Sequence, residues 1–149
     1  MHRSIALLAA VLLGAFCVHA APSEKQKETF LSGFRMAVAA NNPAMLTSLL
    51  YSEGVSQENI RNTQNGAFRR LLDKLQPFKN DLSYEWSDAA TSKEPATKVV
   101  NGIRYTTTSS PATYLEIRSG GAVITGFFLC EEYGKLLLIG TMTEPAPGR

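Results

Sequence analysis

The sequence predicts an α+β domain in which three N-terminal helices pack on a curved antiparallel sheet of four to five strands. Two observations carry this prediction. Apolar residues recur at helical spacing between Ser23 and Pro77, and from Leu82 onward they alternate with polar residues, as in half-buried strands. Because the helices all precede the strands, we expect the helices to lie together on one face of the sheet.

The first twenty residues predict a secretory signal peptide. The apolar run Ile5–Val18 is shorter than the ~20 residues that a membrane-spanning helix needs. It is followed by Val18-His19-Ala20, which has the compact residues of a signal-peptidase site and predicts cleavage after Ala20. We therefore expect a periplasmic or secreted protein with no membrane span in its mature form.

The length of the chain after this cleavage site predicts a single domain over residues 21–143. The Pro- and Gly-rich composition of residues 144–149 predicts a flexible tail. An uncleaved signal anchor is the alternative. Cys17 raises a minor second alternative, a lipoprotein, although Phe16 stands where a small residue normally precedes the lipidated cysteine.

The composition excludes several chemistries. His2 and His19 both precede the cleavage site, so the mature chain has no imidazole and one thiol, Cys130. This removes most side-chain catalysis and most metal sites, and we expect no metal and no cofactor.

The mature chain keeps 14 basic and 13 acidic residues, a net charge near +1 that predicts no nucleic-acid partner. Cys130 lies in an apolar segment and is expected to be a small core residue, with an intermolecular disulfide as the alternative.

Local signals place the first two helices. Ser23 is expected to cap the first, with Gln26 three residues later closing a capping box. Asn42 and Pro43 then provide the cap and the first residue of the second helix.

The third helix is expected to begin at the cap Ser56 and to end at Pro77. Asn65-Gly66 in its middle is expected to bend or split it, because glycine costs about 1 kcal/mol relative to alanine in a helix interior.

The strands follow. Leu82, Tyr84 and Trp86 are expected on one side of the first strand, and a polar loop over residues 88–97 follows it. Asn101-Gly102 predicts a tight hairpin turn.

Beyond this hairpin, residues 113–118 alternate again. The segment 122–130 is apolar on both faces, which predicts a central strand covered on both sides. Residues 135–142 are expected to form the last strand.

The order of elements resembles the NTF2-like superfamily, the cone-shaped α+β domains that include SnoaL-like and cystatin-like proteins. The resemblance rests on FLSGFRMAVAANNPAMLTSLL at residues 30–50 and GGAVITGFFLCEEYGKLLLIG at 120–140, and covers the chain from about Thr29 to Met142. It implies a sheet that wraps around an apolar pocket.

Within this resemblance, the missing imidazole and the supply of aromatic residues favour an exported, non-catalytic module that binds a small apolar ligand or a peptide. Aromatic residues at helical and alternating strand positions are the candidates for its binding site: Phe34, Tyr84, Trp86, Tyr114 and Phe128.

Two alternatives remain. The first is a homodimeric interaction module that uses the sheet face of Tyr114, Glu116 and Arg118. The second is a histidine-independent isomerase or lyase, which needs a carboxylate, from Glu85 or Glu116, inside an apolar cavity. Further candidates, by residue type only, are Asp81, Asp88, Tyr84, Tyr105, Tyr114 and Tyr133.

Overall fold

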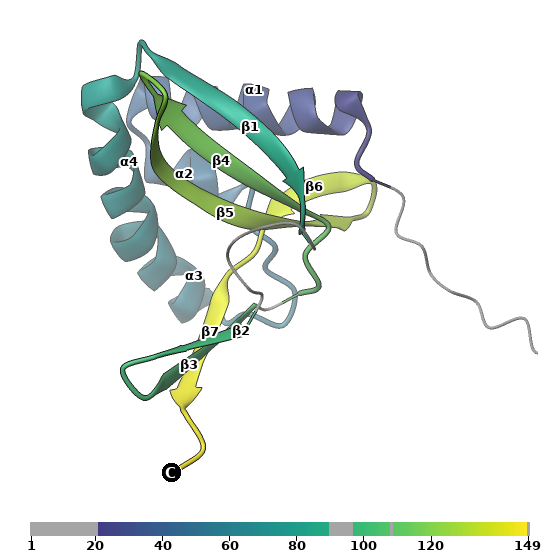
Figure 1. Ribbon diagram of the computed structural model, residues 1–149, viewed down its shortest axis with the longest axis vertical. Coiled ribbons are helices and arrows are strands. Elements are labelled where there is room, and N and C mark those ends of the chain that lie inside the picture. The colour runs from purple at the N-terminus through teal and green to yellow at the C-terminus, as the bar shows by residue number, and fades with distance from the viewer. Residues whose placement is uncertain (1–20, 90–96, 108, 149) are drawn as a thin grey trace, which may run out of the picture.

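The computed structural model describes residues 21–89, 97–107 and 109–148. The expected signal peptide, both histidines and Cys17 lie outside the described residues, as does most of the expected loop after the first strand. The described residues form an α+β fold in which helices cover one face of a four-stranded antiparallel sheet (Figure 1).

The first two helices begin where the sequence predicts. α1 spans Glu24–Ala40; Ser23 N donates to Gln26 Oε1 (2.7 Å) and Gln26 N donates to Ser23 Oγ (3.2 Å), which confirms the capping box. α2 spans Pro43–Thr47, and the Asn42 side chain accepts a hydrogen bond from Ala44 N. Both starts depend on side-chain oxygens that satisfy otherwise unpaired backbone N–H groups.

The third predicted helix is present and is interrupted where Asn65-Gly66 predicts. Ser56 caps α3 (Gln57–Thr63), which continues through a π-helical turn, η1 (Gln64–Phe68), into α4 (Arg69–Leu75). A 3-10 turn, η2 (Gln76–Phe78), contains Pro77 and ends the helical region.

The four-stranded sheet has the order β1-β4-β5-β6 with antiparallel pairing throughout. Its strands are β1 (Leu82–Asp88), β4 (Thr113–Ser119), β5 (Ala122–Glu132) and β6 (Lys135–Leu138). A bulge between Ile117 and Arg118 shifts the register of β4 against β5. Residues Leu49–Tyr51 hydrogen-bond to Leu138 and so cover the β6 edge of this sheet.

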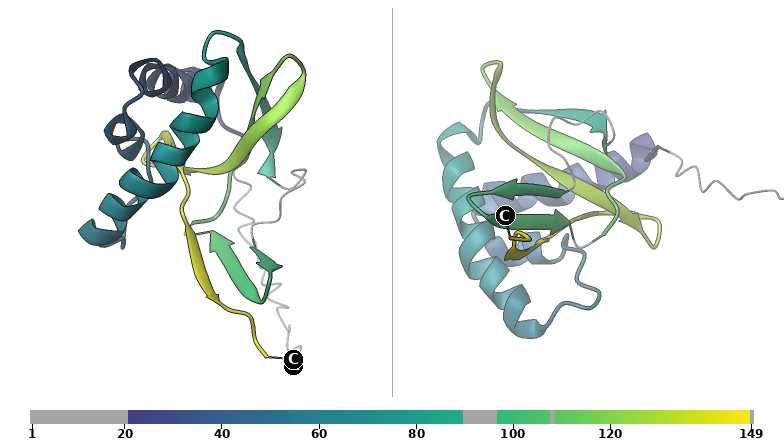
Figure 2. Two further views of the ribbon diagram at one scale, coloured as in Figure 1. Left: turned by 90° about the vertical axis from the view of Figure 1, so that its left-hand side faces the viewer. Right: turned by 60° about the horizontal axis from the view of Figure 1, so that its bottom comes forward.

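A second, three-stranded sheet was not predicted. It has the order β2-β3-β7, with β2 (Thr97–Val100), β3 (Ile103–Thr107) and β7 (Thr141–Pro145), and projects away from the helices (Figure 2). The expected Asn101-Gly102 turn joins β2 to β3, with positive φ at both residues. The predicted antiparallel sheet of four to five strands thus corresponds to the four-stranded sheet beneath the helices, and the described residues add three further strands in a separate sheet.

The difference between the predicted sheet and the two observed sheets arises in residues 135–145. The expected single strand over residues 135–142 breaks at Ile139 and Gly140, so that β6 joins one sheet and β7 the other. β7 also runs to Pro145, into the segment expected to be a loose tail. Strand partners are chosen by pairing across the fold, which a local apolar pattern does not specify.

The core lies between the helices and the four-stranded sheet. It is built from apolar residues of α1, α2, η1, α4, β4, β5 and β6: Phe30, Leu31, Phe34, Ala37, Val38, Leu46, Leu50, Phe68, Leu72, Leu75, Leu115, Ile117, Leu129, Leu136 and Leu138. The expectation that β5 is covered on both sides holds only for its second half, since Leu129 and Cys130 are buried but Val123 is half-exposed. Among the described helices, none combines the length and the apolar character needed to cross a bilayer.

Candidate functional site

The five predicted binding residues lie on opposite faces of the four-stranded sheet. Tyr84 and Trp86 on β1 pack toward α1, together with Phe34 of that helix. Tyr114 and Phe128 stand opposite each other on β4 and β5 and point away from the helices, with ring centroids 5.1 Å apart. The structure therefore divides these five side chains between two separate regions.

Phe34 is a core residue. Its side chain is 0% exposed, and its ring contacts those of Phe30, Tyr84 and Phe127 at centroid distances of 6.0, 6.2 and 5.6 Å. These separations are typical of packed aromatic pairs in protein interiors. Phe34 thus fills the space between α1 and the sheet that the resemblance assigned to a ligand.

Tyr84 and Trp86 form the rim of this core, and each carries a cation over its ring. Lys27 Nζ lies 5.9 Å from the centroid of the Trp86 ring, and the Arg35 guanidinium carbon lies 5.2 Å from that of Tyr84. Both cations come from α1, and both distances are within the range of cation–π attraction.

The outer face of the sheet carries a charged group beside its aromatic pair. Arg118 Nη1 donates to Glu85 Oε2 at 3.2 Å. Arg118 Nε lies 3.0 Å from Glu116 Oε1, but its N–H does not point at that oxygen, so this contact is an ion pair without a hydrogen bond. The predicted face of Tyr114, Glu116 and Arg118 is therefore present.

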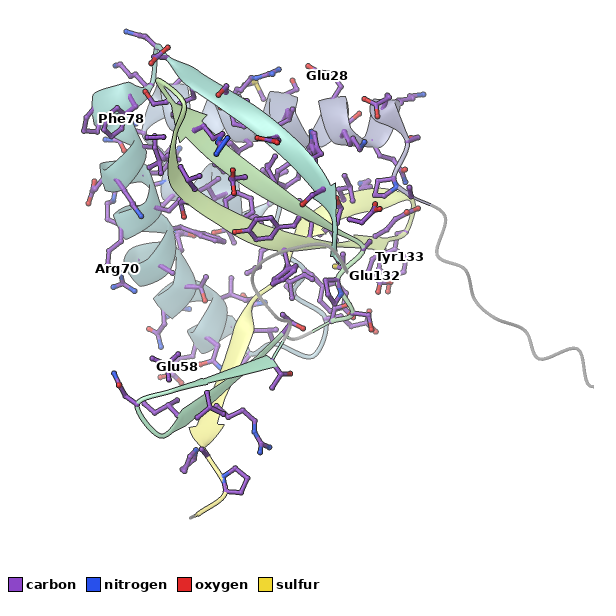
Figure 3. The ribbon with its side chains drawn as sticks, viewed as in Figure 1. Glu28, Glu58, Arg70, Phe78, Glu132 and Tyr133 are labelled. Atoms are coloured by element: carbon purple, nitrogen blue, oxygen red, sulfur yellow. The ribbon has the colours of Figure 1, made fainter. Side chains whose placement is uncertain are left out.

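A pocket opens where the end of α1 meets the start of β1. Its volume is about 210 Å³, and it is lined by Arg35, Val38, Ala39, Lys79, Asn80 and Tyr84. Figure 3 labels Phe78, which directly precedes the lining residue Lys79, and Glu28, the α1 residue whose carboxylate accepts a hydrogen bond from the lining residue Arg35. A volume of this size is below the range usual for drug-sized ligands and suits a small ligand.

Three structural features shape this pocket. Arg35 is held between Glu28, to which its Nη1 donates at 2.9 Å, and the ring of Tyr84. Lys79 and Asn80 are placed by the turn that follows Pro77. Gln76 Nε2 donates to the Val38 carbonyl at 2.8 Å, which joins the two walls and occupies one of the last carbonyls of α1.

The electrostatic character of the pocket is positive. Its lining includes two cations and no carboxylate. Burial raises the pKa of the Tyr84 phenol above its usual 10.0, and the nearby Arg35 only partly opposes this rise. The Tyr84 hydroxyl therefore stays protonated at neutral pH and is available as a hydrogen-bond donor.

Sequence reasoning identified Tyr84 but not the other polar residues of the pocket. Arg35 lies outside the apolar stripe of α1, and Lys79 and Asn80 lie in a short connection without a motif. The only local signals are Arg35, near the C-terminal end of α1, and Lys79, two residues after Pro77. Neither signal specifies that the two segments meet.

Among the described residues, the carboxylates considered for acid–base chemistry are not enclosed in an apolar interior. None of the Asp and Glu residues in ranges 21–89, 97–107 and 109–148 whose side chains are described is buried. Asp81 accepts from Ser119 Oγ at 2.8 Å, and Glu85 and Glu116 pair with Arg118 on the outer face. Asp88 is exposed.

Tyr133 and Cys130 are two further side chains with reactive groups. Tyr133, 80% exposed, donates to Glu53 Oε2 at 2.8 Å. Cys130 is buried, as expected for a core residue, and burial raises the pKa of its thiol. Within the described part of the chain, no cluster of three or more His, Cys, Asp and Glu side chains is arranged to hold a metal ion.

Comparison with known proteins adds no assignment: no family model, curated protein or solved structure matches this chain.

Proposed function

We propose that this chain is an exported, non-catalytic binding module of NTF2-like architecture, and that it binds a small ligand or the end of a peptide in the pocket between α1 and β1. Export rests on the sequence of residues 1–20. The NTF2-like assignment rests on element order and on helices covering one face of an antiparallel sheet.

One observation carries the proposed site. The pocket combines two apolar residues of α1, the buried Val38 and the exposed Ala39, with polar side chains from α1, from the turn after η2 and from β1. Small-molecule sites typically have this composition. The pocket is smaller than the 300–1,000 Å³ usual for drug-sized ligands, so the ligand, or the part of it that enters, is correspondingly small.

A fragment titration tests this function. The protein purified after expression of the full chain is titrated with benzoate, benzamide and phenyl phosphate, and its backbone amides are followed by NMR. We expect saturable shifts at Val38, Ala39 and Asn80 with at least one probe. Ala39→Leu, which places a larger side chain in the pocket, should abolish them.

Ala40→Leu is the matched control, because Ala40 is exposed beside Ala39 and does not line the pocket. It should leave the shifts unchanged. Shifts that survive Ala39→Leu, or the absence of saturable shifts with all three probes, would contradict the proposed site.

The outer sheet face supports a second candidate function, self-association into a homodimer. Tyr114 and Phe128 are only half-buried there, beside a group that contains both acidic and basic side chains. A two-fold axis parallel to this face and passing beside Arg118 would bring the Arg118 of one copy toward Glu85 and Glu116 of the other, because the same patch serves both copies. Sedimentation velocity at several hundred micromolar tests it, and a strictly monomeric protein would exclude it.

A further inference from the structure

We infer that the pocket between α1 and β1 selects ligands by an anionic oxygen group, a carboxylate or a phosphate, attached to a small apolar body. This inference rests on the proposed function and adds the chemical class of the ligand.

The polar side chains of the pocket can all donate hydrogen bonds. Arg35 and Lys79 donate and carry positive charge, the Asn80 amide donates through its NH₂ group, and Tyr84 donates through its hydroxyl. A cationic ligand would meet two like charges and no carboxylate in this lining. An anionic oxygen group would meet up to four donors.

Arg35 retains free donors for such a group. Its Nη1 is engaged by Glu28, but a guanidinium has five N–H groups in a planar fork that matches carboxylate and phosphate. The contact with the Tyr84 ring restricts this fork and lowers the entropy lost when a ligand binds. Among the described residues, Lys79 makes no ion pair.

The last carbonyl groups of α1 repel an anion in the pocket less than unpaired carbonyl groups at a helix end would. The last carbonyls of a helix carry partial negative charge, and α1 ends beside the pocket. The Val38 carbonyl accepts from Gln76 Nε2 and from Asn41 N, and the Ala37 carbonyl accepts from Asn42 N. These bonds occupy carbonyl groups that would otherwise repel an anion.

The test compares probes of similar shape and different charge. Benzoate and phenyl phosphate should bind at least tenfold more tightly than benzamide, because only the two anions can form charge-assisted hydrogen bonds with Arg35 and Lys79. Arg35→Gln and Lys79→Gln should each weaken the two anions about tenfold and leave benzamide unchanged. Arg61→Gln and Lys74→Gln, at exposed positions outside the pocket, are the matched controls and should change nothing.

Glu28→Gln provides an independent test. Glu28 competes with the ligand for Arg35 and does not line the pocket, so its neutralisation should strengthen benzoate binding roughly two- to fivefold, the range expected for one exposed ion pair. Comparing benzoate with phenyl phosphate separates a carboxylate ligand from a phosphate ligand. Either preference supports the inference.

The two proposals fail in different ways. If benzamide binds as tightly as benzoate and Ala39→Leu abolishes both, the pocket is a binding site but the anion inference is wrong. If none of the probes shifts the pocket amides, the proposed function fails and the inference fails with it. Anion binding that persists in Arg35→Gln and Lys79→Gln would place the anion elsewhere on the protein and would overturn the inference alone.

Discussion

The phenol ring of Tyr114 lies across Gly126 on the neighbouring strand. A Cβ atom at position 126 would overlap the Tyr114 ring and would lie 3.0 Å from the Leu115 carbonyl oxygen. Tyr114 thereby covers a position where β5 has no side chain, a pairing that compensates for the low strand propensity of glycine.

Gly126→Ala should therefore destabilise the fold by about 1–3 kcal/mol, the usual cost of overpacking. Tyr114→Ala removes the overlapping ring, so the double variant should be more stable than the sum of the two single effects implies. Urea denaturation of the four proteins measures this coupling. Strict additivity would contradict the contact.

Phe34 should behave as a core residue rather than as a ligand contact. Phe34→Ala should cost about 3–5 kcal/mol, because its ring is fully enclosed by the rings of Phe30, Tyr84 and Phe127. Met36→Ala, on the same helix with the side chain 55% exposed, is the control and should stay within about 0.5 kcal/mol. Similar losses for both variants in thermal denaturation would show that α1 presents a different face to the sheet.

Gln26 joins the start of α1 to the turn between β5 and β6. Its Nε2 donates to Glu131 Oε1 at 2.8 Å, in addition to its role in the capping box. Gln26→Glu keeps the capping box but sets a second carboxylate against Glu131. Mutual repulsion raises the pKa of both carboxyls in the folded state, so the variant should be most stable below about pH 4.3 and lose stability as pH rises through the raised values.

The expected loss at pH 7 is roughly 1 kcal/mol relative to the wild type, measured by urea denaturation at several pH values. Gln26→Ala loses the hydrogen bond to Glu131 and also the capping-box bond from Ser23 N, but it adds no charge, so it is the control for the pH dependence. A pH dependence that is the same in both variants would contradict the contact with Glu131.

Tyr84 should contribute to alkaline unfolding. Because its pKa is raised in the folded state, the unfolded chain releases this proton first, and stability should fall as pH rises above 10.0. Tyr84→Phe removes this contribution and should make the alkaline decline shallower. Thermal denaturation between pH 8 and 11 measures the difference between the two proteins, and parallel curves would contradict the burial of this hydroxyl.

Features that depend on neighbouring residues in the chain were predictable. The caps Ser23, Asn42 and Ser56 form where expected because each satisfies N–H groups within its own first helical turn. The irregular turn at Asn65-Gly66 follows from the low helix propensity of glycine.

The pocket was not predictable in this way. Arg35 and Lys79 are more than forty residues apart, and nothing in either local pattern indicates that they share a surface. Likewise, the aromatic pattern correctly placed Tyr84 and Trp86 on one side of β1 but did not show that Phe34 would fill the space beside them.

The sequence by itself determined the α+β class, the helix starts and the Asn101-Gly102 turn, because these depend on backbone preferences and side chains within a few residues. Only the tertiary structure decided that residues 135–145 serve two sheets, that Phe34 occupies the interior and that two cations meet beside Tyr84. Those outcomes depend on which distant surfaces bury each other best, a choice made by the whole chain together.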